Sequence, residues 1–285
     1  MVNRKYLSLP VGLVGRALRA LSTKPGKGFL ANKIAAPLMR GRGVETVVDM
    51  TNPGGGKLVC NLDDWIPWNV FIHGNYIMEK NHEKFMLDIA RDCEVIFDVG
   101  ANIGYYTVQF GRLANGQVYS FEPMSYQFNI LKKNVELNNL ANVATLKSIV
   151  TDSVGVKRIY FSSMNNTGMS SLELKSDTYE DVKTIMIDDY CRENEIDAID
   201  LVKIDVEGHE LCVLKGMSTL LSGKKVKNIF IEMNNQTLPA AGTSIDSVVG
   251  FLDKFGYAGY SIKTTARTAY EGGDESLVYF THVPD

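Results

Sequence analysis

Acidic residues close several apolar runs of this 285-residue chain, at positions where an α/β protein would hold a ligand. Asp98 and Glu122 end two runs in the first half of the chain, and Asp205 and Glu232 end two in the second half. Because parallel strands end along one edge of their sheet, we expect these side chains to converge there. Carboxylates at that edge could bind hydroxyl groups or a positive charge, or remove a proton from a substrate. The sequence therefore predicts an acidic site at the carboxyl edge of a parallel sheet.

A glycine-containing turn follows Asp98 and indicates which ligand that edge would hold. Gly100 and Gly104 allow a tight turn and a close approach of the ligand to the backbone, and the helix after them begins with free amides. A dinucleotide site requires G-x-G-x-x-G, whereas this turn has Asn102 in its middle. Glu122 could accept both hydroxyls of a ribose. Together these residues favour S-adenosylmethionine, whose positive charges suit an acidic strand end.

Three motifs resemble the FkbM family of methyltransferases. They are Asp98-Val-Gly-Ala-Asn-Ile-Gly-Tyr-Tyr-Thr107, Phe121-Glu122-Pro123 and Lys203-Ile-Asp-Val-Glu-Gly-His-Glu210. The resemblance extends from about residue 58 to about residue 262. It implies an S-adenosylmethionine-dependent O-methyltransferase that acts on a hydroxyl, most often of a sugar in a glycan or glycolipid precursor.

The candidate catalytic residues are Asp205, Glu207 and His209, which follow the central strand closely. Methyl transfer requires an acceptor oxygen about 3 Å from the methyl carbon and a group that removes its proton. A histidine is the side chain best suited to that proton transfer near neutral pH, so His209 is a candidate base. In class I methyltransferases the turn after the third strand meets the adenine ring, which adds Asp152 to the cofactor contacts.

A magnesium site is the alternative interpretation of the same strand ends. Asp205, Glu232 and Asn234 would offer oxygen ligands from neighbouring strands, which is the type of ligand that magnesium accepts. Such an ion would lower the pKa of the acceptor hydroxyl. Glu232 and Asn234 can equally well orient the hydroxyls of a sugar, and we favour the interpretation without a metal.

Alternating strands and helices are expected to position these residues. The predicted strands of the main sheet are residues 95–98, 117–122, 143–150, 201–205, 227–233, 257–263 and 276–283. A hairpin arm over 156–163 and a short strand over 183–187 are also predicted. The predicted helices are residues 79–91, 125–137, with Ser125 as N-cap, 211–221 and 244–255. The alternation predicts a doubly wound, mostly parallel seven-stranded sheet, of the class I methyltransferase type that the resemblance implies. The last two strands have no helix between them, which predicts an antiparallel hairpin at one edge.

Charge separates the first 43 residues from the rest. Residues 1–43 carry nine Lys and Arg and no acid, for +9, whereas residues 44–285 carry −12, for a net charge of −3. We therefore predict a basic extension over 1–43 and a methyltransferase domain over 44–285. Residues 11–21 have apolar residues at helical spacing beside basic ones, which suits packing on the domain or on a second subunit, or contact with an anionic membrane. The acidic domain argues against nucleic acid as a substrate.

Cysteine usage and hydropathy predict a cytoplasmic protein. The four cysteines show no CxxC spacing, so neither a disulfide framework nor a metal cluster is expected. No apolar run has the length of a membrane span, and no signal peptide is evident. Two other functions stay open: a nicotinamide-dependent oxidoreductase, against which the missing glycine motif argues, and a non-catalytic cofactor-binding scaffold docked through residues 1–43.

Overall fold

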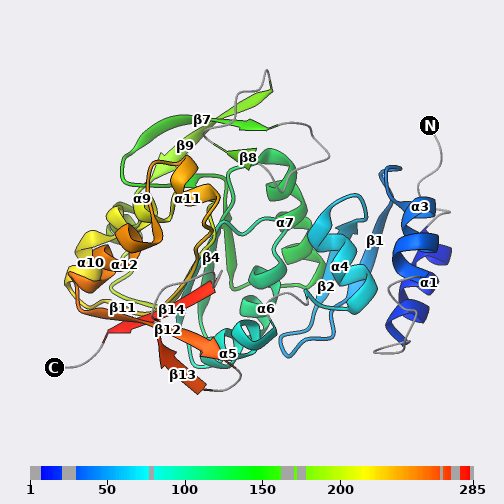
Figure 1. The fold of residues 1–285 in the computed structure, drawn as a ribbon, viewed down its shortest axis with the longest axis horizontal. Helices are drawn as coiled ribbons and strands as arrows, with labels where there is room; N and C mark the ends of the chain where they lie inside the picture. Colours follow the sequence, from blue (N-terminus) through cyan, green and yellow to red (C-terminus); the bar gives the residue numbers. More distant parts are fainter. Residues whose placement is uncertain are drawn as a thin grey trace.

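The fold consists of a large central sheet, two smaller sheets and the helices around them (Figure 1). The computed structural model describes residues 8–20, 30–76, 80–161, 170–171, 178–263, 266–270 and 277–282. Within these ranges, no helix combines the length and the apolar character needed to cross a bilayer.

The central sheet has eight strands in the order β13-β12-β14-β11-β10-β3-β4-β5. They are β3 (Val95–Val99), β4 (Gln117–Phe121), β5 (Val143–Leu146), β10 (Ile199–Ile204), β11 (Val226–Glu232), β12 (Tyr257–Lys263), β13 (Ala266–Ala269) and β14 (Leu277–His282). The five strands from β11 to β5 are parallel, and β14, β12 and β13 are antiparallel. This confirms the mostly parallel sheet with an antiparallel edge. The prediction of seven strands was one too few, because β13 has no apolar run and is defined by its pairing with β12.

Helices cover both faces of this sheet, as expected for a doubly wound fold. They are α4 (Trp65–His73), α5 (Lys80–Ala90), α6 (Tyr105–Leu113), α7 (Ser125–Leu137), α8 (Ile187–Glu193), α9 (Glu210–Lys215), α10 (Ser218–Ser222), α11 (Thr237–Ala240) and α12 (Ile245–Asp253). Neighbouring strand residues alternate between two cores: Ile96 packs with α5 and α6, and Phe97 packs with α8, α9, α10 and α12. The sheet is therefore buried on both sides, which explains its continuous apolar strands.

The predicted helix over 211–221 is interrupted, and the structure shows why. A Cβ on Gly216 would lie 2.1 Å from the backbone oxygen of Thr151, so the chain passes close to a neighbouring loop there. The carboxylate of Asp188 then accepts hydrogen bonds from the amides of Thr219 and Leu220, at 2.8 and 3.0 Å. That carboxylate stabilises the start of α10 as a separate helix.

A four-stranded sheet lies over the carboxyl edge of the central sheet (Figure 1). The sequence predicted strands over 156–163 and 183–187, which overlap two of its strands, but not their pairing into a separate sheet. Its strands are β6 (Ile149–Val150), β7 (Gly155–Phe161), β8 (Ser170–Ser171) and β9 (Tyr179–Ile185). The single strand predicted over 143–150 was wrong, because the chain leaves the central sheet at Lys147 and Ser148. Beyond them, β6 pairs with β9 in parallel.

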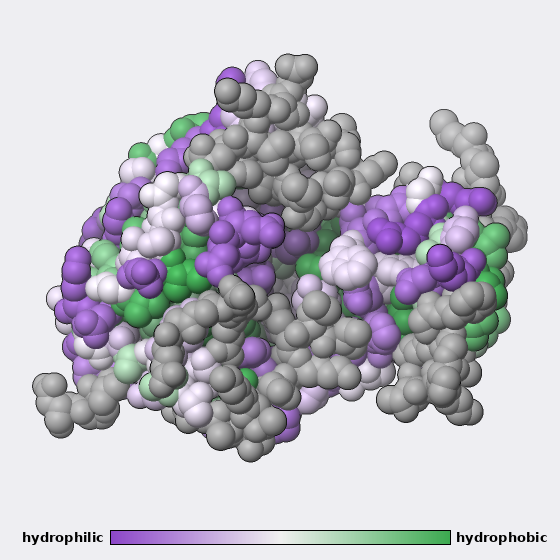
Figure 2. Space-filling view, viewed as in Figure 1, coloured by the Kyte–Doolittle hydropathy of each residue, from purple (hydrophilic) through white to green (hydrophobic). Residues whose placement is uncertain are grey.

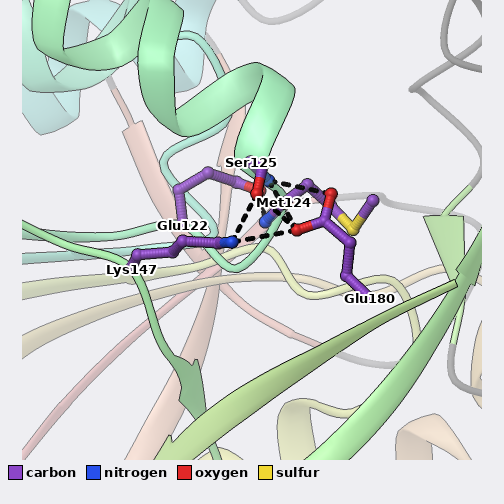
Figure 3. A network of polar contacts seen from close by, with 5 residues as sticks. All are labelled: Glu122, Met124, Ser125, Lys147 and Glu180. Atoms are coloured by element: carbon purple, nitrogen blue, oxygen red, sulfur yellow. Dashed lines mark hydrogen bonds and ion pairs between the residues drawn. The ribbon is translucent and has the colours of Figure 1, made fainter.

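Hydrogen bonds of Glu180 of β9 connect this second sheet to the start of α7 (Figure 3). Its Oε2 accepts hydrogen bonds from the Ser125 hydroxyl at 2.5 Å and from Lys147 Nζ at 2.9 Å. Burial raises the pKa of Glu180, but the bonds from Ser125 and Lys147 more than offset this and hold it below its ordinary value. The helix begins at Ser125 as predicted, but Met124 is the N-cap and Glu180 supplies the carboxylate.

The N-terminal elements attach to the domain through α4 and α7. The hairpin of β1 (Glu45–Asp49) and β2 (Lys57–Asn61) is held by Asn134 of α7, whose Oδ1 accepts from Val59 N at 2.7 Å. Helix α1 (Ser8–Ala20) packs against Phe71 of α4, and Arg19 Nη1 donates to the Phe71 carbonyl at 2.7 Å. Two short helical turns, Leu30–Ala35 and α3 (Ala36–Met39), follow α1. The described part of residues 1–43 thus contacts the domain, and the boundary after Gly43 stays a prediction.

Candidate active site

A cavity of about 480 Å³ lies at the carboxyl edge of the parallel strands. Figure 2 shows the molecule hollowed between its main body and the segment that carries α4. The predicted site residues among its lining are Gly100, Asn102, Glu122, Asp205, Glu207, His209 and Glu232. The lining also includes residues from the second sheet, from the segment 64–67, from the starts of α6 and α7, and Lys203 of β10. The strand ends therefore converge as the sequence indicated.

The turn after β3 depends on glycine at Gly100. Its φ is +82°, and a Cβ there would lie 1.8 Å from the backbone oxygen of Asp205, so only glycine lets the ends of β3 and β10 approach each other. Asn102 also has a positive φ, of 51°, and its backbone N–H donates to the carboxylate of Glu122. Gly104 lies behind the cavity, where a Cβ would meet Leu131 of α7 at 2.6 Å. Its role is the packing of two helices.

Glu122 is held beside the turn by two backbone amides. Its Oε2 accepts from Asn102 N and its Oε1 from Met124 N, both at 2.9 Å. Only 5% of the residue is exposed, and this burial outweighs the two amides and raises its pKa to about 7. Each carboxylate oxygen can accept a second bond, so Glu122 could still receive hydroxyls from a ligand.

Asp98 lies beneath the cavity and does not line it. It is 1% exposed, and its Oδ2 accepts a 2.6 Å hydrogen bond from the Thr107 hydroxyl of α6. Burial raises the pKa of Asp98, and the neighbouring Lys203 opposes that change. The structure therefore gives Asp98 a supporting position, in place of the direct ligand contact that we expected.

Lys203 is a site residue to which sequence reasoning gave no role. Its Nζ donates to Asp205 Oδ2 at 3.0 Å and lies 5.0 Å from the centre of the Tyr106 ring. The side chain is 3% exposed, and a buried charge of this kind requires a partner. The signal in the sequence was a lysine within the apolar strand β10. The ion pair fixes the orientation of Asp205 at the cavity wall.

The structure brings Asp205, Glu207 and His209 to one wall of the cavity. Glu207 has a φ of +52° and is exposed at the mouth of the cavity. Partial enclosure by the cavity walls, together with the charges of Asp205 and Glu210, raises its pKa to about 7. His209 takes the N-cap position of α9. The catalytic roles of the three residues stay predictions.

Two predicted residues lie apart from this wall. Asp152 is exposed and outside the lining. Asn234 is also outside it, because its Oδ1 accepts from Gln236 N at 2.7 Å within its own turn. Of the alternative magnesium ligands, only Asp205 and Glu232 line the cavity. In the described parts of the chain, no three His, Cys, Asp or Glu side chains are grouped in a way that would hold a metal ion.

Ser148, four residues before Asp152, lines the cavity where Asp152 does not. It is 5% exposed, and its hydroxyl has no hydrogen-bond partner among the described residues. Ile149, Val150 and Ile159 lie beside it in the lining. A signal was available in the polar pair Lys147 and Ser148 within an apolar run. An unsatisfied hydroxyl among apolar side chains fits the polar edge of an adenine ring.

The lining as a whole fits S-adenosylmethionine. Apolar residues and Ser148 suit its base, Glu122 suits its ribose, and acidic side chains suit its positively charged amino and sulfonium groups. Lys203 is the one Lys or Arg among the described lining residues, and Asp205 neutralises it. The volume lies within the range of small-molecule sites.

Comparisons with known proteins agree with this fit. The model of the "Methyltransferase FkbM domain" matches residues 98–258, which is more than half of the chain. The hexuronic acid methyltransferase AglP of Haloferax volcanii is 30% identical over 156 residues, which are 55% of this chain and 62% of that protein. The chain thus spans about three fifths of that relative's length. The 2-O-methyltransferase NoeI of Sinorhizobium fredii is 25% identical over 195 residues, covering 62% of this chain and 78% of that protein.

Among solved structures, an O-methyltransferase from Bacillus cereus in complex with SAH is similar with a TM-score of 0.40 and 14% identity, covering 72% of this chain and 81% of that one. Because the matching family is one of methyltransferases, the alternative function of a nicotinamide-dependent oxidoreductase is rejected. With its glycine turn, its acidic strand ends and a matching family model over residues 98–258, this chain belongs to the FkbM family of S-adenosylmethionine-dependent methyltransferases.

Proposed function

We propose that this protein is an O-methyltransferase whose acceptor is a hydroxyl group of a sugar, in a glycan or glycolipid precursor. The observation that carries the proposal is the placement of Asp205, Glu207 and His209 on one wall of the cavity that also holds the glycine turn and Glu122. The names of two relatives, a hexuronic acid methyltransferase and a 2-O-methyltransferase, support a sugar hydroxyl as the acceptor.

The residues of the cavity divide into a cofactor part and an acceptor part. Bound S-adenosylmethionine would supply a methyl group on a positively charged sulfur, which departs as a neutral thioether when the acceptor oxygen takes the methyl. Gly100, Asn102, Glu122 and Ser148 would bind the cofactor. Asp205, held by Lys203, would orient the acceptor hydroxyl, and His209 would take its proton as the oxygen–carbon bond forms. Glu207 at the mouth would then pass that proton to water.

Metal-free proton removal is the form of the mechanism that we favour. Glu232 lines the cavity and could orient a second hydroxyl of the sugar, whereas the amide oxygen of Asn234 is bound within its own turn. A magnesium ion at this site would have two protein ligands from the predicted set, Asp205 and Glu232.

A screen of acceptors tests the proposed function. The purified full chain would be incubated with S-adenosylmethionine and with sugar nucleotides, oligosaccharides or simple alcohols, and the products would be read by mass spectrometry. We expect a mass increase of one methyl group on a sugar. Cofactor binding without transfer to any compound would instead favour the non-catalytic scaffold. Transfer only to non-sugar alcohols would contradict the choice of acceptor.

We further propose that the N-terminal segment holds the enzyme at an anionic membrane. Hydrophobic surface gathers at the end of the molecule where α1 and α3 lie (Figure 2). Leu13 and Leu38 there are 60% and 61% exposed. Residues 1–43 also carry nine positive charges and no acid. Exposed apolar side chains beside basic ones suit the surface of an anionic bilayer.

A further inference from the structure

The cavity has an aromatic side chain at its rim that the proposed mechanism does not use. Trp65 begins α4, lines the cavity and is 58% exposed. Trp68, one turn later on the same helix, is 2% exposed and stacks on Phe71 with 5.7 Å between ring centres. These are the two tryptophans of the chain. The helix thus buries one indole in the core and presents the other at the mouth of the cavity.

Asp64, the residue before Trp65, also lines the cavity and has spare hydrogen-bonding capacity. Its side chain interacts with the Tyr126 hydroxyl, but its Oδ2 has no hydrogen-bond partner among the described residues. Burial and the neighbouring Asp63 raise its pKa to about 6, so the group is ionised at neutral pH. Asp63 differs in this respect, because its carboxylate accepts from the amides of Gly41 and Gly43.

The charge of the lining is strongly one-sided. The acidic residues among the described lining are Asp64, Glu122, Asp205, Glu207 and Glu232. Glu122 and Glu207, whose pKa values are raised to about 7, carry only part of their charge at neutral pH, so the charge selection rests mainly on Asp64 and Glu232. The opposing lysine, Lys203, is buried and already paired with Asp205. Once the cofactor is bound beside Glu122, Asp64 next to Trp65 and Glu232 at the end of β11 would still be close to the acceptor. A second carboxylate brought into this enclosed space would be repelled, because interactions between charges are only weakly screened there.

We propose that the cavity accepts an uncharged sugar ring, which stacks on Trp65, and excludes sugars that carry a carboxylate. The inference rests on the proposed function and narrows its substrate class. The apolar face of a pyranose suits an indole, and its hydroxyls suit carboxylate acceptors. A uronic acid, the substrate class in the name of the Haloferax volcanii relative, would meet repulsion, because the one lysine or arginine among the described lining residues, Lys203, is already paired with Asp205.

Matched pairs of sugars test the charge selection. The methyl glycosides of glucose, galactose and mannose would each be compared with the corresponding methyl glycuronide, which differs only at C6. We expect kcat/KM to favour the neutral member by at least about tenfold, since like charges brought together cost several kcal/mol. The preference should shrink at high ionic strength and in Glu232→Gln. Preference for the uronate would overturn the inference and leave the proposed function standing, whereas no transfer to any sugar would overturn both.

Tryptophan fluorescence tests the stacking on Trp65 independently of turnover. With S-adenosylhomocysteine bound, a neutral glycoside should protect Trp65 from quenching by acrylamide, and a uronate should not. Trp65→Ala should abolish that change and raise KM for the sugar, and Trp65→Phe should restore most of the affinity. Val154→Ala, which truncates a 68% exposed residue outside the cavity, should change neither. Complete protection by S-adenosylhomocysteine alone, or an unchanged KM in Trp65→Ala, would overturn the stacking.

Discussion

At the scale of single residues, Glu122 combines burial with two amide hydrogen bonds, and its raised pKa links folding to pH. A carboxyl whose pKa is higher in the folded state, here about 7 against an ordinary 4.5, binds its proton more tightly when folded. Its contribution to stability is therefore present at low pH and is lost as the pH rises from about 4.5 to about 7.

We predict that this loss is about 3 kcal/mol, at about 1.4 kcal/mol for each pKa unit. Glu122→Gln removes the titration, so the difference in unfolding free energy between the variant and the natural chain should move in the variant's favour by that amount between pH 4.5 and pH 8. Urea unfolding at both pH values measures it. Other titrating groups cancel in the difference, and a difference that does not vary with pH would refute the assignment.

The proposed role of His209 as the group that removes the proton leads to a second prediction for a single residue. His209→Ala should lower the rate by about 10²- to 10⁴-fold and leave cofactor binding largely intact. EDTA should leave turnover unchanged, because the proton has an acceptor that needs no ion. If EDTA abolished turnover and magnesium restored it, Asp205 and Glu232 would be metal ligands and our choice would be wrong.

The convergence of Glu122, Asp205 and Glu232 was predictable, because a general rule places the ends of parallel strands at one edge. That Asp98 does not line the cavity could not be predicted, because its side chain accepts a hydrogen bond from Thr107 beneath the turn. Ser148 was overlooked because the position of the cavity lining depends on where the chain leaves the central sheet, and the polar pair Lys147 and Ser148 was the one local sign of that exit. Trp65 joined the site through the packing of α4, which no local pattern reveals.

At the scale of elements, α7 was predictable from its helical periodicity, and four of the five parallel strands from their apolar runs. The fifth, β5, was predicted four residues too long. The second sheet was missed, since contacts between distant residues define it. Lys147 leaves the central sheet and pairs with Glu180, which lies 33 positions later. The break between α9 and α10 likewise depends on Asp188, a residue of another helix.

The contacts of Glu180 with Ser125 and Lys147 lead to a prediction, and the next residue, Asp181, offers a matched control. Glu180→Gln removes a charge that accepts bonds from Ser125 and Lys147 at the start of α7, and should cost about 1 kcal/mol of unfolding free energy. It should also weaken cofactor binding, because the same junction positions Ser148. Asp181→Asn changes an exposed pair with Arg158 and should do neither. Equal effects of the two variants, measured by urea unfolding and calorimetry, would contradict this role of Glu180.

At the scale of the whole molecule, α1 and α3 of the basic N-terminal segment lie at one end of the fold (Figure 1). Its truncation would also remove the contacts of α1 with Phe71, so point variants test membrane contact more cleanly. The full chain should sediment with anionic vesicles at low salt, and Leu13→Glu or Leu38→Glu should weaken that binding. Val156→Glu, at a residue 65% exposed on the second sheet, is the control. Indifference of the full chain to such vesicles would refute the proposal.

Transfer of a labelled methyl group tests the central claim most directly. The full chain would receive S-adenosylmethionine with a deuterated methyl and a neutral sugar, and NMR would locate the label in the product. The account predicts that the labelled methyl group is bound to one former hydroxyl oxygen of the sugar and to no other atom. It also predicts that His209→Ala loses the transfer while calorimetry still shows cofactor binding. A label on any other atom, or full transfer by His209→Ala, would contradict the account.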